Sequence, residues 1–492
     1  MIYGGKIMAT ELKKKGIIRS KAYMINAIIG VVIMFGFGFI PPVEPITAMG
    51  MKVLGIFLGM IYLYSSCDVN WPSLLGIVGL SIVGYCSLSS AAAGSFGHSV
   101  VFQSMTAYIV AGSLNYYGVT EQIARWMLSR KALRGRPYLF NYIIYLSLMF
   151  ICIFTSSLAM IILYWAIFDG ICKVLDYKRG DSFVTSTIVG IALAFVVGGA
   201  IAPIRGWQMT LFSLWGETVS PLSLAKFMAI TIPGALLSMG GYLFYQVKIL
   251  KADYSKIVNF DVTSLQSAEK MDTRQKKLLW VAIIVFFFVF LAALLPKSFP
   301  LYDLMVNKVS AAGFFALGAA YLALASLDGK ESLINFAEVA GKCVQWNVLL
   351  MIGGTMVVAS ALTNESTGVV AFISQSLGGI FEGRGSWFVL IVAMVITTLL
   401  TNAASNIAIG TAMIPILAPF IQSTGSNAMA VGIMMIWLVN MGLILPGASA
   451  PVGLIHGNDQ LTHGEAYKFS CIGMLIIFIA TIPLAIIANI AF

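Results

Sequence analysis

Small polar side chains interrupt long apolar stretches of this sequence at several places. Thr155, Ser156 and Ser157 stand together in "IFTSSLAM", and Ser405 and Asn406 stand in "TNAASNIA". Hydroxyl and amide groups donate hydrogen bonds to an anion, and their oxygens are ligands that hard cations accept. The two clusters therefore predict a small polar site for an anion, an alkali cation or both.

An arginine marks a third interruption. Arg205 lies in "GGAIAPIRGWQ", among glycines and a proline, and Ser449 lies in the comparable stretch "LPGASAPVG". A charged side chain within an apolar span costs roughly 3 kcal/mol on insertion scales, so it needs a partner or a function. Arginine stays protonated when desolvated and binds a carboxylate in bidentate fashion. We predict that Arg205 is a fixed cation in an anion site; the alternative is a structural cation held by loop carbonyls or reaching an interface.

The composition indicates an integral membrane protein. The 492 residues are 59% hydrophobic and 10% charged, and apolar runs long enough to cross a bilayer recur from residue 22 onwards. Most of the 30 Lys and Arg residues fall in loops that lie on the same face of the membrane if the apolar runs cross it in alternating directions. The positive-inside rule makes that face cytoplasmic. The net charge of +10 therefore reflects topology and contact with membrane lipid, and no nucleic-acid partner is expected.

The order of the apolar runs predicts an all-α protein with about 11 transmembrane helices and two re-entrant helical hairpins. We divide the chain into a cytoplasmic tail (1–21), a first half (22–247), a cytoplasmic linker (248–277) and a second half (278–492). The first half contains a hairpin at 137–174 and a broken span at 183–215. The second contains a hairpin at 386–422, a broken span at 428–455 and a last span.

Each half thus places one hairpin before one broken helix. An odd number of crossings separates the halves, so the sequence predicts an inverted repeat. Paired broken helices in such a repeat point to a transporter with its binding site near the middle of the membrane. No nucleophile, metal or cofactor constellation suggests an enzyme.

These motifs resemble those of the divalent anion/sodium symporter family, along essentially the whole chain. That family carries Ser-Asn-Thr motifs at its hairpin tips and Thr-Pro-Pro-Asn-like segments where later helices unwind. Here Ser405-Asn406-Ile407 keeps Ser-Asn, and "PGASAPVGLIHGN" keeps Pro451 with Val452 in the place of Asn. The first tip has no Asn, and the segment around Arg205 departs furthest from the pattern.

The resemblance implies a homodimer and elevator-type alternating access for di- or tricarboxylates. The lack of a eukaryotic-style targeting segment or glycosylated loop favours the bacterial inner membrane. The resemblance assigns substrate contacts to the two tips and the two breaks, and a sodium ion to each half. The expected substrate-binding residues are Thr155, Ser156, Ser157, Arg205, Ser405, Asn406 and Ser449. The candidate sodium ligands are Thr401, Ser405, Asn406 and Ala448. No other cofactor is expected.

Laid on the family pattern, Arg205 falls close to the first-half sodium position, so its charge would replace that ion. A site that is positive when empty reorients reluctantly, which favours sodium-independent exchange of anions. The alternatives are a sodium-coupled symporter that uses the second-half site, a cation/proton antiporter or oxyanion permease of related fold, and a receptor-like membrane protein. His456 is either an interfacial residue or a second cation facing the site.

Overall fold

The structure is a computed structural model of the chain. It describes residues 20–130, 133–155, 157–204, 206–259, 270–327, 329, 331–381, 384–403, 405–446 and 448–492. Two predicted site residues, Ser156 and Arg205, lie outside the described residues, as does most of the predicted tail.

The described residues form helices and no named strand, which confirms the predicted all-α class. The first half contains α2 (Lys21–Gly36), α3 (Ala48–Ser66), α4 (Asn70–Ile82), α5 (Leu88–Phe96), α6 (Ser99–Tyr116), α7 (Val119–Leu128), α8 (Pro137–Phe154), α9 (Ala159–Val174), α10 (Ser182–Ala200), α11 (Gly206–Thr218) and α12 (Leu224–Phe244). The second half contains α13 (Thr273–Leu294), α14 (Ser310–Leu324), α15 (Phe336–Cys343), α16 (Trp346–Thr363), α17 (Val369–Phe381), α18 (Ser386–Ala403), α19 (Asn406–Thr424), α20 (Ala428–Val439), α21 (Ala450–His456) and α22 (His463–Ala491). A π-helical turn, Tyr245–Ile249, extends α12, and another, Asp303–Val309, precedes α14.

Polar residues set where several helices begin. The Thr47 side chain accepts a hydrogen bond from a backbone N–H in the first turn of α3. Asp272 with Gln275, and Thr462 with Glu465, form capping boxes at the starts of α13 and α22. These side chains satisfy N–H groups that have no partner within the helix, so each apolar run begins at a defined residue.

The order of elements is the same in both halves. A helix pair, a short helix, a long helix and an amphipathic helix precede a two-helix hairpin and a broken helix: α3–α11 in the first half and α13–α21 in the second. Packing repeats as well, because α6 packs against α14 and α15 while α16 packs against α4 and α5. A Cβ at Gly112 of α6 would lie 2.3 Å from Cys343 of α15, and one at Gly353 of α16 would lie 2.5 Å from Ser95 of α5. Glycine lets these helices approach closely at corresponding places.

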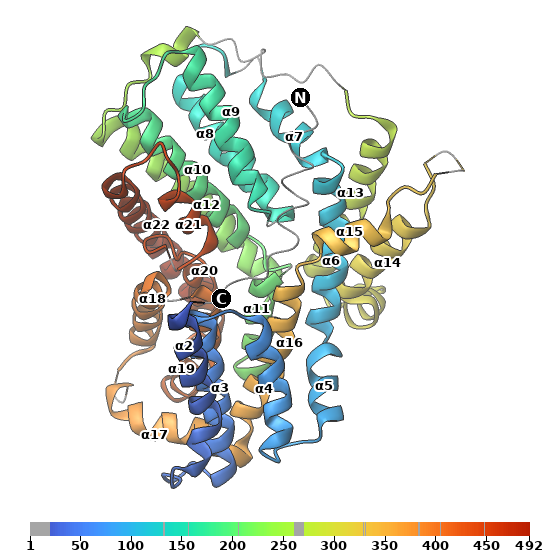
Figure 1. Ribbon diagram of the computed structural model, residues 1–492, viewed down its shortest axis with the longest axis vertical. Coiled ribbons are helices and arrows are strands. Elements are labelled where there is room, and N and C mark those ends of the chain that lie inside the picture. Colours follow the sequence, from blue (N-terminus) through green and yellow to red (C-terminus); the bar gives the residue numbers. More distant parts are fainter. Residues whose placement is uncertain are drawn as a thin grey trace.

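The hairpins start from opposite ends of the molecule. Figure 1 shows the amphipathic helix α7, which precedes α8 and α9, at the top, and α17, which precedes α18 and α19, at the bottom. Thr155, Ser157 and Leu158 lie between α8 and α9, and Ser405 lies between α18 and α19.

The helices form two packed groups, joined along the chain by α7, by α17 and by the segment between α12 and α13. We call α2–α6 with α13–α16 the outer group, and α8–α12 with α18–α22 the hairpin group. Within the hairpin group, α10 contacts α8, α9, α12, α21 and α22. Figure 1 shows α8, α10, α12 and α22 on the left and α5, α6, α13 and α14 on the right.

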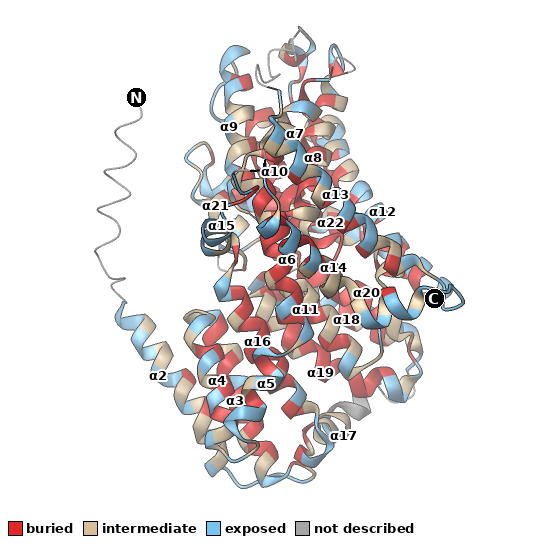
Figure 2. Ribbon diagram, turned by 90° about the vertical axis from the view of Figure 1, so that its right-hand side faces the viewer, coloured by how far each residue is buried: buried red, intermediate tan, exposed pale blue. Residues whose placement is uncertain are grey.

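Burial distinguishes central from peripheral helices. The apolar span of α10 is 94% buried, whereas the span Lys21–Phe39, which comprises α2 and the short turn of helix after it, is 11% buried. Figure 2 shows α2 at the lower left with mostly exposed or half-buried residues. Eleven helices within the described ranges are long and apolar enough to cross a membrane, including the hairpin arms α8, α18 and α19. The protein is therefore a multi-pass integral membrane protein.

Candidate functional site

A cavity of about 820 Å³ lies where both hairpin tips and both helix breaks meet. Six of the predicted site residues line it: Thr155, Ser157, Ser405, Asn406, Ala448 and Ser449. Segments almost 300 residues apart in the chain therefore share one wall. Thr401 is fully buried just behind this wall, within hydrogen-bond distance of Asn406.

The first tip is ordered by its own threonine. The Thr155 N–H donates to the Ile151 carbonyl at the end of α8, and its side-chain oxygen accepts from the Ser157 N–H at 3.3 Å. Thr155 is 6% exposed, and α9 starts at Ala159, which also lines the cavity. The turn thus presents the amino end of α9 to the cavity, where free N–H groups favour an anion.

The second tip contacts the second break through a compact set of oxygens. The Thr401 hydroxyl lies 2.8 Å from Asn406 Oδ1 and 2.6 Å from the Val439 carbonyl, and Asn406 Nδ2 donates to the Asn440 carbonyl at 3.2 Å. A Cβ at Gly442 would lie only 2.1 Å from Asn406 Oδ1 and 2.7 Å from the Thr401 carbonyl. Only glycine leaves these oxygens this close to the unwound backbone.

Asn402 holds the rest of the second break in place. Its Oδ1 accepts from the N–H groups of Leu443 and Ile444 at 2.8 and 3.0 Å, and its Nδ2 donates to the Met441 carbonyl at 3.1 Å. His456 Nε2 lies 3.1 Å from the Ile444 carbonyl, so this histidine contacts the break from α21. Unwound backbone inside a membrane protein needs such partners because water is not available.

The first break is satisfied from neighbouring helices. Thr231 of α12 donates to the Ile201 carbonyl at 2.7 Å, and Gln103 of α6 donates to the Ile204 carbonyl at 3.2 Å. Gly206 starts α11 with a φ of +62°, and a Cβ there would lie 2.8 Å from the Tyr108 hydroxyl. The glycine next to Arg205 is therefore required both by its left-handed backbone and by close contact with α6.

The two breaks also contact each other directly. Gln208 Nε2 on the first turn of α11 donates to Asn440 Oδ1 at the end of α20 at 2.6 Å, and both residues line the cavity. Asn440 Nδ2 in turn donates to the Ile436 carbonyl. An anion or a cation bound here would contact both halves at once.

The described part of the wall is polar and contains one cationic side chain. Among the described residues that line the cavity, Lys342 is the only one with a side chain charged at neutral pH. The first residues of α9, α11 and α19 line it as well, and the positive end of a helix dipole favours an anion. The described wall is therefore suited to negative charge.

Sequence reasoning missed several lining residues. Asn440 and Gln208 had a detectable signal, since each is an amide beside a predicted break. Tyr108 and Lys342 had none, because they come from helices outside the predicted motifs.

Residues 63–440 match the citrate transporter family. The chain belongs to this family. It is a secondary transporter and not an enzyme, and its predicted resemblance to the divalent anion/sodium symporters is confirmed.

Two relatives illustrate how divergent this transporter is. It is 21% identical over 478 residues to an uncharacterized transporter of Haemophilus influenzae, covering 95% of this chain and 97% of that one. It is 21% identical over 432 residues to the sodium-dependent dicarboxylate transporter SdcS of Staphylococcus saprophyticus, covering 84% of this chain and 81% of that one.

Solved structures share the fold of this transporter. The YdaH transporter of Alcanivorax borkumensis aligns with a TM-score of 0.56 at 12% identity, over 90% of this chain and 99% of that one. MtrF of Neisseria gonorrhoeae aligns with a TM-score of 0.54 at 12% identity, over 99% and 98% of the two chains.

Proposed function

We propose that this transporter exchanges dicarboxylates across the membrane without sodium, and that Arg205 is the fixed counter-ion of the bound anion. The observation that carries the proposal is the single cavity lined by both tips and both breaks, with no carboxylate among its described residues. Arg205 follows the buried Ile204 and precedes Gly206, which lines that cavity. A related chain, SdcS, is a sodium-dependent dicarboxylate transporter, which supports the substrate class and not the absence of sodium coupling.

Binding would use donors from both halves. Ser157 and the amino end of α9 would hold one carboxylate, and Ser405 and the amino end of α19 the other. Arg205 would supply the positive charge, because a guanidinium remains protonated and its fork matches a carboxylate. When the anion leaves, the cation stays behind in a low-dielectric site, so the empty carrier moves slowly. This asymmetry is the physical basis for exchange.

Alternating access would move the hairpin group against the outer group. In this structure α19 packs on α3 and α16 of the outer group, whereas α9 packs on α8 and α10 of its own group. By the repeated order of elements, the counterparts of α3 and α16 are α13 and α6. We infer that α9 packs against α6 and α13 in the opposite state, where α19 is released.

Competition by unlabelled anions tests the substrate class. Labelled succinate would be taken up into proteoliposomes preloaded with succinate, in the presence of excess succinate, citrate, acetate or glycine outside. We expect the divalent and trivalent anions to compete and acetate and glycine to leave uptake unchanged. Strong competition by acetate, or no succinate uptake at all, would refute a dicarboxylate substrate.

A specific arrangement favours sodium-coupled symport as the second candidate. Asn406 Oδ1 and the Thr401 carbonyl lie beside Gly442, where a Cβ would not fit. The Thr401 hydroxyl and the Asn440 carbonyl each contact the Asn406 side chain. These are oxygens of the kind that a hard cation prefers, so the residues fit a sodium ion. Bound there, sodium would add a positive charge next to the substrate and couple its own gradient to uptake. Ser405 and Ala448, the other candidate ligands, line the cavity beside them.

Replacing external sodium by choline separates the candidates. Exchange predicts equal succinate uptake in both media. Symport predicts that uptake falls in choline, and that Thr401→Ala raises the sodium concentration needed for half-maximal uptake.

The predicted homodimer, the inner-membrane location and the cytoplasmic N-terminus belong to this proposal. Light scattering of the purified protein in detergent would test the dimer. Labelling of single cysteines placed in the linker and in the loop before α3, in intact cells and in opened vesicles, would test the orientation.

A further inference from the structure

Lys342 stands where the cavity wall meets the molecular surface. It lines the cavity, and its side chain is 63% exposed. It belongs to α15, a short helix of the outer group that the predicted binding motifs do not include. Other polar side chains of the wall, Asn115, Gln345 and Asn347, are close to it in the fold, at the end of α6 and the start of α16.

Contacts within the outer group hold the ammonium group in position. Lys342 Nζ lies 3.3 Å from the Tyr116 hydroxyl and 3.4 Å from Glu338 Oε2, and it stands 5.0 Å from the centre of the Tyr116 ring. The Tyr116 hydroxyl donates to Glu338 as well. This hydrogen bond and then the Lys342 ammonium lower the pKa of Glu338, so both members of the pair are charged at neutral pH.

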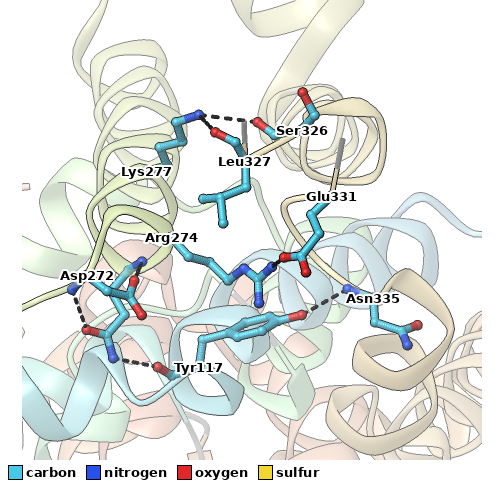
Figure 3. A network of polar contacts seen from close by, with 9 residues as sticks. Tyr117, Asp272, Arg274, Lys277, Ser326, Leu327, Glu331 and Asn335 are labelled. Carbon is cyan, nitrogen blue, oxygen red and sulfur yellow. Dashed lines mark hydrogen bonds and ion pairs between the residues drawn. The ribbon is translucent and has the colours of Figure 1, made fainter. Parts of the chain in front are cut away.

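A network of polar contacts fixes α15 to the rest of the outer group. Figure 3 shows Arg274 at the start of α13 paired with Glu331, and Tyr117 accepting a hydrogen bond from the Asn335 N–H. The Arg274–Glu331 distance is 2.6 Å and the Asn335–Tyr117 distance is 2.9 Å. Lys277 donates to the Ser326 carbonyl at 3.2 Å. Because Asn335 caps α15, this network sets where Lys342 lies.

We propose that Lys342 is a steering residue. It attracts the dianionic substrate to the cavity and makes the first contact with it on the predicted cytoplasmic side of the membrane. The role rests on the proposed function, because only an anionic substrate would be attracted. A cation at the mouth of a polar cavity raises the local concentration of anions and their rate of entry, and salt screens this effect. Glu338 opposes it by neutralising part of the charge. By the charge distribution, this rim is on the predicted cytoplasmic face.

The test is the KM for succinate at the cytoplasmic face, measured in inside-out vesicles preloaded with succinate, at low and at high ionic strength. At low salt we expect Lys342→Gln to raise KM by roughly threefold to tenfold with the maximal rate unchanged. At about 0.5 M salt the difference should vanish. Lys342→Arg should keep the wild-type KM, and Glu338→Gln should lower it.

Lys173→Gln is the matched control. Lys173 is also exposed and also pairs with a carboxylate one helical turn away, Asp169, but it does not line the cavity. We expect its KM to equal that of the wild type. This control separates steering from a general loss of surface charge.

The possible failures can be told apart. If the wild type transports succinate and Lys342→Gln has an unchanged KM at low salt, steering is refuted and the proposed function stands. A lower maximal rate that Lys342→Arg does not restore would also refute it, because that pattern belongs to a structural residue. If the wild type transports no dicarboxylate, the proposed function itself fails and Lys342 loses this role with it.

Discussion

Asn406 makes two hydrogen bonds of opposite sense, one within the second hairpin and one to the second break. Its Oδ1 lies 2.8 Å from the Thr401 hydroxyl, and its Nδ2 lies 3.2 Å from the Asn440 carbonyl. Both partners are buried or form part of the cavity wall. The Asn406 side chain therefore lines the site and also holds its other parts in position.

Asn406→Ala should reduce succinate transport about tenfold, because it leaves the buried Asn440 carbonyl without its side-chain donor, at a cost of roughly 1–3 kcal/mol, whereas the Thr401 hydroxyl keeps the Val439 carbonyl as acceptor. The initial rate in proteoliposomes, normalised to reconstituted protein, measures this. Ser423→Ala, on the other end of the same helix, is the control and should keep the wild-type rate. An Asn406→Ala variant as fast as the control would contradict the assigned role.

Gly442 of the second break lies directly against the Asn406 side chain. Gly442→Ala places a Cβ 2.1 Å from Asn406 Oδ1, so the tip or the unwound segment must move. We expect a loss of transport of roughly tenfold or more, since small misplacements of a binding group have effects of this size. Gly453→Ala adds the same methyl group with its nearest neighbour 3.7 Å away, and it should be active. Equal rates for the two variants would show that the close approach does not matter.

At the scale of elements, α11 links the two groups of helices. Glu217 at its end lies 3.1 Å from His98, which precedes α6 of the outer group. If the hairpin group moves against the outer group, this contact must break in each cycle. The pair is therefore a place where the motion can be stopped.

A double variant, His98→Cys with Glu217→Cys, should lose transport when a short, cleavable bifunctional thiol reagent bridges the two cysteines. Cleavage of the bridge should restore the rate. Each single variant treated with the same reagent is the control for the native cysteines. Full transport by protein that mass spectrometry shows to be bridged would exclude movement between α6 and α11.

The elements of the site were largely predictable from sequence, for a physical reason. A turn or break inside an apolar run needs small or polar residues, so Thr155, Ser405 and the glycines around Arg205 indicated where α8, α10 and α18 end. The short helices α15 and α17 were missed because neither forms a long apolar run. The hydrogen bond between Gln208 and Asn440 was not predictable, since it depends on how the two halves pack.

At the scale of the molecule, one cavity between two repeated halves accounts for both the family assignment and the proposed mechanism. The contacts of α19 with α3 and α16 have no counterpart at α9 among the principal helix contacts of the described residues. That asymmetry is expected of one state in an alternating cycle, in which the cavity opens on one side only. The direction of net transport would then be set by the anion gradients.

The most direct test of the account is counterflow with the wild type and Arg205→Ala. Labelled succinate is offered, without sodium, to proteoliposomes preloaded with succinate or left empty. The account predicts rapid uptake only into preloaded wild-type liposomes, and a loss of at least about tenfold in Arg205→Ala, the cost of removing a charged partner from a buried pair. Sodium-driven uptake into empty liposomes, with Arg205→Ala as active as the wild type, would contradict it.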